Sequence, residues 1–319
     1  ESSDCELENA LSDERVGITV TSSGERLHET LLPAGLTHEA ALSDFLDESD
    51  LILVSGGARG IASIVVRKLL KSTRSRFLLI GRSTGGPSWL SPEFAVRVEY
   101  LSCDISDSRA VRAAKLDTLP ITVFIHAAGT GSICPFMQRQ VQDMQEIFAA
   151  KVSGLDHIAQ NLDQSGLRAI ILFSSISAFF GMHGQADYAA ANALLDGFTC
   201  KAPVLSLQWT AWDDEGMAVR GDTRSLLSTT GLEFLPGAEG AELFEQLVGR
   251  WMSEGSQSAI LSLIKGVPET YRSLLPRETG DAEMVERPIQ PSAAQCGIYY
   301  LERAYPLGDC HNVSWSEKM

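Results

Sequence analysis

Short apolar runs alternate with amphipathic helical patterns along most of the chain. Apolar runs bounded by turn residues are typical of strands buried on both faces, and a period of 3.6 residues is typical of helices. The expected strands cover residues 51–54, 76–80, 96–101, 121–125, 169–173, 204–207 and 258–263. The expected helices cover residues 61–70, 108–115, 141–161, 187–199 and 238–251. This alternation predicts an α/β fold with a Rossmann-like, doubly wound parallel sheet of about seven strands.

The two ends of the chain differ in composition from the centre. Residues 1–48 are polar and acidic, and only the alternating stretch 16–20 predicts a strand. Residues 277–291 are charged and contain proline, which indicates a linker, whereas residues 292–319 show no period. We therefore expect an N-terminal linker or remnant over 1–48, one α/β domain over 49–276, and a linker with an unassigned tail over 277–319. Because the chain begins with Glu1, we also expect it to be part of a longer polypeptide.

Composition and charge narrow the class of partner. The chain has 319 residues, of which 44% are hydrophobic, so it can form a sizeable core. Its formal net charge of −15 disfavours nucleic acid and anionic membranes as partners, and no apolar run reaches the roughly 20 residues that span a bilayer. Six scattered cysteines favour a reduced, cytoplasmic protein, and the spacing of Cys296, Cys310 and His311 matches no common zinc site, so no metal is expected.

A glycine-rich turn follows the first apolar run. Its glycines would let a dinucleotide pyrophosphate approach the backbone, where the N-terminus of the next helix can bind the anion. A tight turn without a ligand is the alternative, but the position after the first strand of a parallel sheet favours a cofactor. The residues expected to bind it here are Ser55, Gly56, Gly57, Arg59, Gly60 and Ile61.

The residues after the next two strands indicate which dinucleotide binds. An NAD site would carry a carboxylate after the second strand to bind the ribose hydroxyls, but this chain has Arg82 and Ser83, which suit a 2′-phosphate. A surface loop is the alternative, and we favour NADPH. After the third strand, Asp104 either accepts a hydrogen bond from the adenine amino group or caps a helix near Ser106.

Three residues on successive elements suggest a catalytic group. Ser175 ends one strand, Tyr188 begins the next helix, and Lys151 lies on the preceding long helix. Reduction of a ketone builds negative charge on its oxygen, which requires a proton donor. A phenol has an ordinary pKa near 10, so it becomes an effective acid at neutral pH only beside a cation such as Lys151. Each residue alone is more often structural, but together at the carboxyl edge of a sheet they predict a reductase site.

The chain resembles the ketoreductase domains of polyketide synthases, within the short-chain dehydrogenase/reductase superfamily. The matching segments, within about residues 49–275, are 55–61, 81–83, 126–129, 151–154, 173–175, 184–185, 188–196, 208–209 and 216–218. Stand-alone reductases carry lysine four residues after the tyrosine, whereas here that residue is Asn192 and the lysine is Lys151, as in synthase domains. The resemblance implies a catalytic tetrad of Ser175, Tyr188, Lys151 and Asn192. It also implies cofactor contacts at Asp104, Ile105, Ala127, Ala128, Gly129, Lys151 and Tyr188.

The resemblance implies NADPH-dependent reduction of a β-ketoacyl thioester carried by an acyl carrier domain, beside neighbouring synthase domains. Docking of the carrier is expected around Arg220 and Arg224 or through tethering. A free-standing dehydrogenase acting on a small alcohol or ketone, and a non-catalytic scaffold domain, are the alternatives.

The sequence departs from the family pattern at several positions. Ala62 replaces the last glycine of the turn. Residues 131–133 (Gly-Ser-Ile) replace the Leu-Asp-Asp signature of one alcohol configuration, and Phe180 stands at the position of the tryptophan linked to the other. The product configuration is therefore not predicted. The stretch after Trp212 lacks the usual Pro-Trp, and we expect a mobile lid over residues 216–230.

Overall fold

The computed structural model describes residues 18–20, 26–28, 41–182, 184–214, 216, 223–228 and 232–264. The predicted tail over 277–319, with Cys296, Cys310 and His311, lies outside the described residues, as do positions 16 and 17 of the first expected strand. Within the described part of the chain, every helix is too short or too polar to cross a lipid bilayer.

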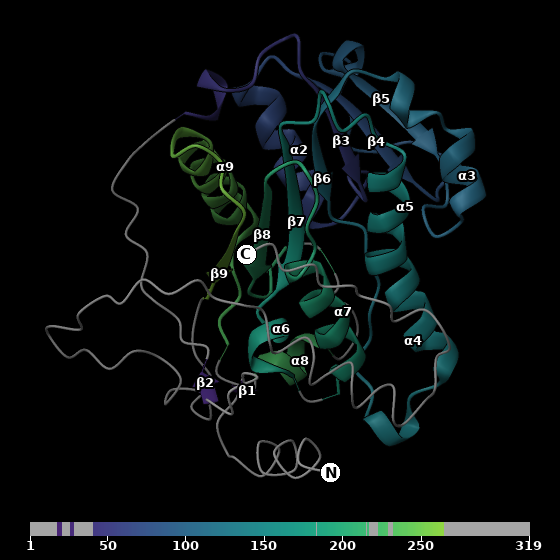
Figure 1. The fold of residues 1–319 in the computed structure, drawn as a ribbon, viewed down its shortest axis with the longest axis vertical. Coiled ribbons are helices and arrows are strands. Elements are labelled where there is room, and N and C mark those ends of the chain that lie inside the picture. The colour runs from purple at the N-terminus through teal and green to yellow at the C-terminus, as the bar shows by residue number, and fades with distance from the viewer. Residues whose placement is uncertain are drawn as a thin grey trace, which may run out of the picture. The chain divides into compact units, whose positions relative to one another are not determined.

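A seven-stranded sheet forms the centre of the main unit, in the order β5-β4-β3-β6-β7-β8-β9, with every neighbouring pair parallel (Figure 1). The strands are β3 (Leu51–Ser55), β4 (Arg76–Gly81), β5 (Val98–Ser102), β6 (Ile121–His126), β7 (Ala169–Ser175), β8 (Val204–Trp209) and β9 (Ala259–Leu263). The chain runs outward from β3 to β5 and then returns to place β6 beside β3. This reversal creates a crevice at the carboxyl ends of β3 and β6. The predicted doubly wound parallel sheet is confirmed.

Helices cover both faces of the sheet because successive strand residues point to opposite sides. On one face, Ile52 and Val54 pack against α2 (Ile61–Ser72) and α9 (Gly237–Ser253). On the other face, Leu53 packs with residues of α3 (Ser108–Ala113), α5 (Gly154–Gln160) and α7 (Ala186–Asp196). Figure 1 shows α9 and α5 on opposite sides of the sheet. The apolar runs of the sequence therefore supply the strand residues of both core layers.

Residues 41–46 also contribute to this core. Leu42 begins the short 3-10 helix η1 (Leu42–Asp44), and Leu46 follows it. Both leucines are buried in the same apolar cluster as residues of α2 and α9. Apolar packing of the main unit thus includes residues before position 49.

A separate unit contains a two-stranded antiparallel sheet of β1 (Ile18–Val20) and β2 (Arg26–His28). Its first strand falls within the stretch 16–20 that alternation indicated, and its second strand was not predicted.

The predicted helix over 141–161 is confirmed, but the π-helical turn within it was not predicted. The structure has α4 (Val141–Phe148), a π-helical turn η5 (Ala149–Ser153) and then α5. Two further short helices, α6 (Ser177–Phe180) and α8 (Thr223–Ser228), were not predicted. The π-helical turn carries Lys151, one of the predicted site residues.

Candidate active site

A cavity of about 390 Å³ lies at the carboxyl ends of the strands on both sides of the β3–β6 switch. Most of the residues predicted from the sequence line it: Gly56, Arg59, Gly60, Ile61, Arg82, Ser83, Asp104, Ile105, Ala127, Ala128, Gly129, Lys151, Ser175 and Tyr188. Ser55, Gly57 and Asn192 do not line it. The cavity therefore brings most of the predicted cofactor-binding residues and three of the four predicted catalytic residues into one continuous site.

The glycine turn between β3 and α2 is shaped to let a ligand approach the backbone. Gly56 has φ +78°, and a Cβ atom there would lie 2.9 Å from the Ala128 backbone. Gly60 has φ +67° and precedes α2, whose N-terminus no described side chain caps. Its first N–H groups are therefore available for an anion. Gly57 is different, because a Cβ there would meet Val54 and Leu79 in the core, so its glycine serves packing.

The loop after β4 is fixed by Tyr100. The single proton of the tyrosine hydroxyl is shared between the carbonyl oxygens of Gly81, at 3.0 Å, and Ser83, at 2.7 Å. The loop holds Arg82 exposed beside the cavity. One end of the cavity therefore carries a guanidinium group that can reach a bound anion.

Asp104 forms a local turn. Its Oδ1 accepts hydrogen bonds from the Ser106 N–H group, at 3.0 Å, and from the Ser106 hydroxyl, at 2.7 Å. The residue that caps α3 is Asp107, which accepts from the Arg109 N–H group. Asp104 is therefore not the cap of α3; it binds Ser106 locally, and its carboxylate borders the cavity, which leaves the contact with adenine a prediction.

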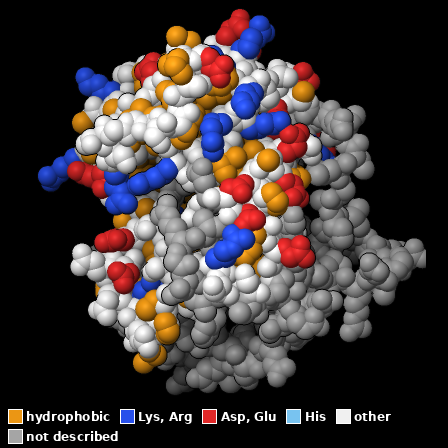
Figure 2. Space-filling model, turned by 180° about the vertical axis from the view of Figure 1, so that it is seen from behind, with side chains coloured by type: hydrophobic (Ala, Val, Ile, Leu, Met, Phe, Trp, Pro, Cys, Tyr) orange, Lys and Arg blue, Asp and Glu red, His pale blue; other side chains and the backbone are white. Residues whose placement is uncertain are grey.

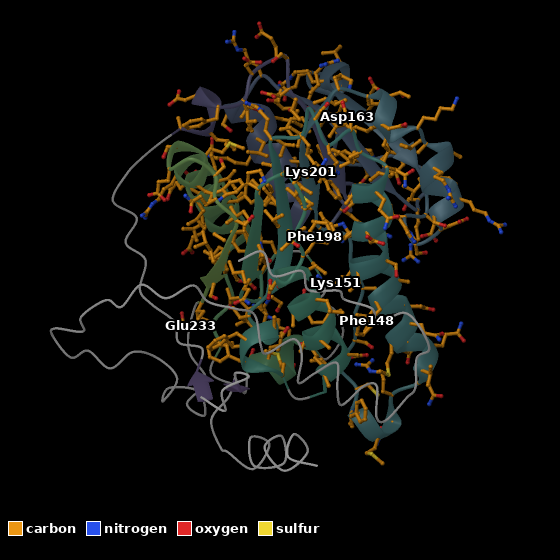
Figure 3. All side chains as sticks on the ribbon, viewed as in Figure 1. Phe148, Lys151, Asp163, Phe198, Lys201 and Glu233 are labelled. Carbon is orange, nitrogen blue, oxygen red and sulfur yellow. The ribbon has the colours of Figure 1, made fainter. Side chains whose placement is uncertain are left out.

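Lys151 is held deep in the site. Only 3% of the residue is exposed, and its Nζ donates to the Phe173 carbonyl at 3.1 Å. The side chain passes over Gly129, where a Cβ atom would lie 3.0 Å from Lys151 Cε. Figure 3 labels Lys151, whose helical turn packs against α7. The ammonium group is 5.2 Å from the centre of the Tyr188 ring.

Ser175 and Asn192 complete the predicted tetrad in different ways. Ser175 Oγ accepts from the N–H group and the hydroxyl of Ser177, so its own proton remains to be donated. Asn192 is fully buried, and its Nδ2 donates to the Tyr188 carbonyl at 2.7 Å. Its Oδ1 has no hydrogen-bond partner among the described residues. Asn192 therefore supports the helical turn that carries Tyr188 from behind the cavity wall.

Burial and nearby charges shift the pKa values of this group. Burial lowers the pKa of Lys151 to about 8, and the Asp196 carboxylate opposes that change. Burial raises the pKa of Tyr188, an effect that a hydrogen bond from the Asn192 side chain reduces. Burial also raises the pKa of Asp196 to about 6, although Ser206 and Gln208 donate hydrogen bonds to it at 2.5 and 2.7 Å.

Sequence patterns missed a buried ion pair beside the site. Arg139 and Asp187 each have only 2% of the side chain exposed, and Arg139 Nε lies 3.0 Å from Asp187 Oδ2. Arg139 also donates to the Ser132 side chain and carbonyl and to the Gly184 carbonyl. Asp187 in turn accepts from the Tyr188 N–H group. The pair thus joins the loop before α4 to the first turn of α7.

Part of the expected lid is described. Thr223 and Leu227 of α8 line the cavity, as does Leu232. Arg224 forms an ion pair with Asp213 and lies 4.8 Å over the Phe234 ring, so its charge is offset locally. Arg220 and most of the remaining lid residues lie outside the described residues.

Two departures from the family pattern have structural consequences. Phe180 is buried with Ile176 and Leu232 and does not line the cavity. After Trp212, Asp214 accepts from the Gly237 N–H group at 2.7 Å and so caps α9. The residues that follow Trp212 thus have a local structural role in this chain.

A family model described as "KR domain" matches residues 51–214. The polyketide synthase ThaG of Burkholderia thailandensis is 31% identical over 64% of the chain, and GfsB of Streptomyces halstedii is 32% identical over 69%. The chain spans only 4% of the length of each of these relatives.

Two solved structures of ketoreductase domains are similar to this chain. A ketoreductase domain from the bacillaene assembly line has a TM-score of 0.59 and 25% identity, covering 79% of this chain and 62% of that one. The first ketoreductase of the tylosin polyketide synthase has a TM-score of 0.67 and 24% identity, covering 82% and 58%. The second likeness shows the fold alone.

Proposed function

The chain belongs to the KR domain family of polyketide synthases, and on this premise we propose that it reduces a β-ketoacyl thioester to the β-hydroxyacyl thioester with NADPH. The observation that carries the proposal is the position of the Lys151 ammonium over the Tyr188 ring on the wall of a cavity that also includes Ser175. This arrangement supplies a proton donor, a cation and a hydroxyl to one carbonyl oxygen.

The residues of the cavity fit a nicotinamide dinucleotide. The uncapped N-terminus of α2 suits a pyrophosphate, and the absence of a side chain at Gly56 leaves room beside the Ala128 backbone. Arg82 and Ser83 suit a 2′-phosphate, which favours NADPH over NADH. When bound, NADPH supplies the hydride.

The side chains of this chain supply the proton and stabilise the developing charge. Tyr188 donates its phenol proton to the ketone oxygen as that oxygen becomes negative. The Lys151 ammonium favours the phenolate that remains, and Ser175 donates a second hydrogen bond to the same oxygen. Asn192 stabilises the turn that holds Tyr188 through the backbone carbonyl.

We assign the substrate to an acyl carrier domain of the same cytoplasmic synthase. Arg224 is paired with Asp213 and therefore offers little net charge for docking. Figure 2 shows acidic and basic side chains interspersed over the described part of one face, which does not favour strong long-range attraction to an acidic carrier. Tethering raises the effective concentration to roughly millimolar without a strong interface, so the covalent link is the main contribution.

The experiment compares one β-ketoacyl group in two forms, on a carrier protein and as a small thioester. The proposal expects NADPH-dependent reduction of both, with a higher kcat/KM for the carrier-bound form. Reduction of a sugar or steroid ketone, with neither thioester reduced, would support a free-standing dehydrogenase instead. No turnover of any ketone, together with no NADPH binding, would support a scaffold domain.

A further inference from the structure

A buried histidine lies between the glycine turn and the turn that carries Lys151. His126 ends β6, is fully buried, and is paired in register with Ser55 at the end of β3. Its Nδ1 is 2.8 Å from Ser55 Oγ, and its Nε2 is 2.8 Å from the Lys151 carbonyl oxygen. His126 does not line the cavity, so it is not available to touch substrate or cofactor.

The chemistry of these two contacts fixes the proton on the imidazole. A carbonyl oxygen only accepts, so Nε2 must carry the hydrogen. Nδ1 is then the acceptor for the Ser55 hydroxyl, whose oxygen is 3.3 Å from the Ala127 nitrogen and 3.4 Å from the Ala128 nitrogen, both of which donate to it. The donor and the acceptor of each hydrogen bond between the Lys151 carbonyl, His126 and Ser55 are therefore fixed. Burial and the nearby Lys151 charge lower the pKa of His126 to about 3, so the ring stays neutral at working pH.

The carbonyl that His126 binds belongs to an unusual turn. Residues Ala149–Ser153 form a π-helical turn, in which the Gly154 N–H group donates to the Ala149 carbonyl. A π turn contains one residue more than an α turn. Replacing it by regular α-helix would rotate the residues on one side by about 100° relative to the other, because each α-helical residue turns the chain by that angle. The direction of the Lys151 side chain thus depends on this turn.

We propose that His126 is a positioning residue for Lys151: held by Ser55, it binds the Lys151 carbonyl and fixes the π-helical turn that points the ammonium group at Tyr188. The role rests on the function proposed above, because it acts through the lysine of that site. On this proposal Ser55 orients His126, because its hydroxyl binds the His126 ring and Ser55 does not line the cavity.

Two substitutions of His126 separate positioning from simple burial. The amide of His126→Gln can place a donor where Nε2 stands, whereas the shorter amide of His126→Asn reaches only the Nδ1 position. The direct readout is the pH titration of the Lys151 13Cε resonance in the protein without cofactor, assigned by its loss in Lys151→Ala. It requires neither substrate nor NADPH, so it is independent of the proposed function.

We expect Lys151 to titrate near pH 8 in the native protein and in His126→Gln. In His126→Asn, the ammonium should leave its buried position and titrate closer to the ordinary value of 10.5. A folded His126→Asn protein in which Lys151 still titrates near 8 would overturn the proposal. If that variant does not fold, Ser55→Ala is measured in the same way; an upward shift supports the proposal, and an unchanged titration overturns it.

Turnover gives a second readout through a double-mutant cycle. His126→Asn should lower kcat about tenfold or more, the scale expected when one buried acceptor loses its donor. In a Lys151→Ala background the same substitution should change kcat less than about twofold, because the residue through which it acts is gone. Independent, multiplying effects would assign His126 a general structural role and overturn the proposal.

Discussion

The Lys151 ammonium lies over the ring of Tyr188, 5.2 Å from its centre, while its Nζ donates to the Phe173 carbonyl at 3.1 Å. Cations are attracted to the face of an aromatic ring, and in the proposed mechanism this ammonium favours the phenolate that remains after proton transfer. Burial has the opposite effect and raises the pKa of Tyr188. On the proposed mechanism, the acidity of the phenol therefore depends on the lysine remaining in place and charged.

Tyr188→Phe should abolish reduction while leaving the fold and NADPH binding intact, because it removes only the phenol oxygen. Loss of a general acid typically lowers the rate by about 10² to 10⁴. Steady-state kinetics, circular dichroism and a cofactor titration measure the three properties. A loss below tenfold would contradict the assignment of Tyr188 as proton donor.

Lys151→Ala should reduce turnover and also weaken NADPH binding, unlike Tyr188→Phe. Lys151 lines the cavity in which we propose that the cofactor binds, and its ammonium lies over the Tyr188 ring, so one side chain can serve both. The dissociation constant for NADPH, measured by fluorescence titration, separates the two variants. Unchanged NADPH affinity in Lys151→Ala would show that Lys151 does not contribute to cofactor binding.

The fold was largely predictable from the sequence because each strand is a short apolar run between turn residues. Strand β7 (Ala169–Ser175) extends two residues beyond the expected 169–173, and β5 begins at Val98, where a single 3-10 turn replaces the expected start. The one-residue shift that a π turn makes in the apolar period was not recognised, because the flanking helices α4 and α5 have only 8 and 7 residues. The π turn at Lys151 depends instead on His126, 25 residues earlier in the chain.

The site was predictable where a residue type follows a strand end, as for Arg82 and Ser175. Contacts between distant residues gave no local signal. Arg139 and Asp187, for example, are 48 positions apart. Ser55 was expected to contact a ligand because it begins the glycine turn, but its hydroxyl binds His126 instead. The individual roles of the predicted site residues stay predictions.

The pH dependence should reflect Lys151, whose pKa of about 8 places its loss of charge on the alkaline side. Below that pH the ammonium is present, so kcat/KM should decline as the pH rises through about 8. Asp196→Asn removes the negative charge that raises the pKa of Lys151, so the decline should begin at a lower pH. Ser206→Ala, which keeps the carboxylate, is the matched control. Identical profiles for native protein and Asp196→Asn would argue against the coupling.

Arg82→Ala should reduce the preference for NADPH over NADH, because Arg82 is the exposed guanidinium at the cavity after β4. The expected change is weaker NADPH binding with little effect on NADH, since only NADPH has the 2′-phosphate. Titration of both cofactors against both proteins measures it. An unchanged preference would require another residue to recognise the phosphate.

Arg139→Met should destabilise the protein by about 3–5 kcal/mol, because it leaves the Asp187 carboxylate buried without its partner. For a domain of this size, the melting temperature should fall by roughly 10 °C. The double variant Arg139→Met/Asp187→Asn should lose less, since no unpaired charge remains. Thermal unfolding followed by circular dichroism compares them, and equal losses in both variants would contradict the account.

The most direct test of the central claim is the transfer of deuterium from 4-deuterated NADPH, with the label at the transferred position, to a β-ketoacyl thioester. The account predicts a β-hydroxyacyl thioester that carries one deuterium at the β-carbon, formed by the native protein and lost in Tyr188→Phe. Mass spectrometry of the product identifies the labelled carbon. If both carrier-bound and small thioesters remain unreduced while the protein binds NADPH, the assignment as a β-ketoacyl reductase is contradicted.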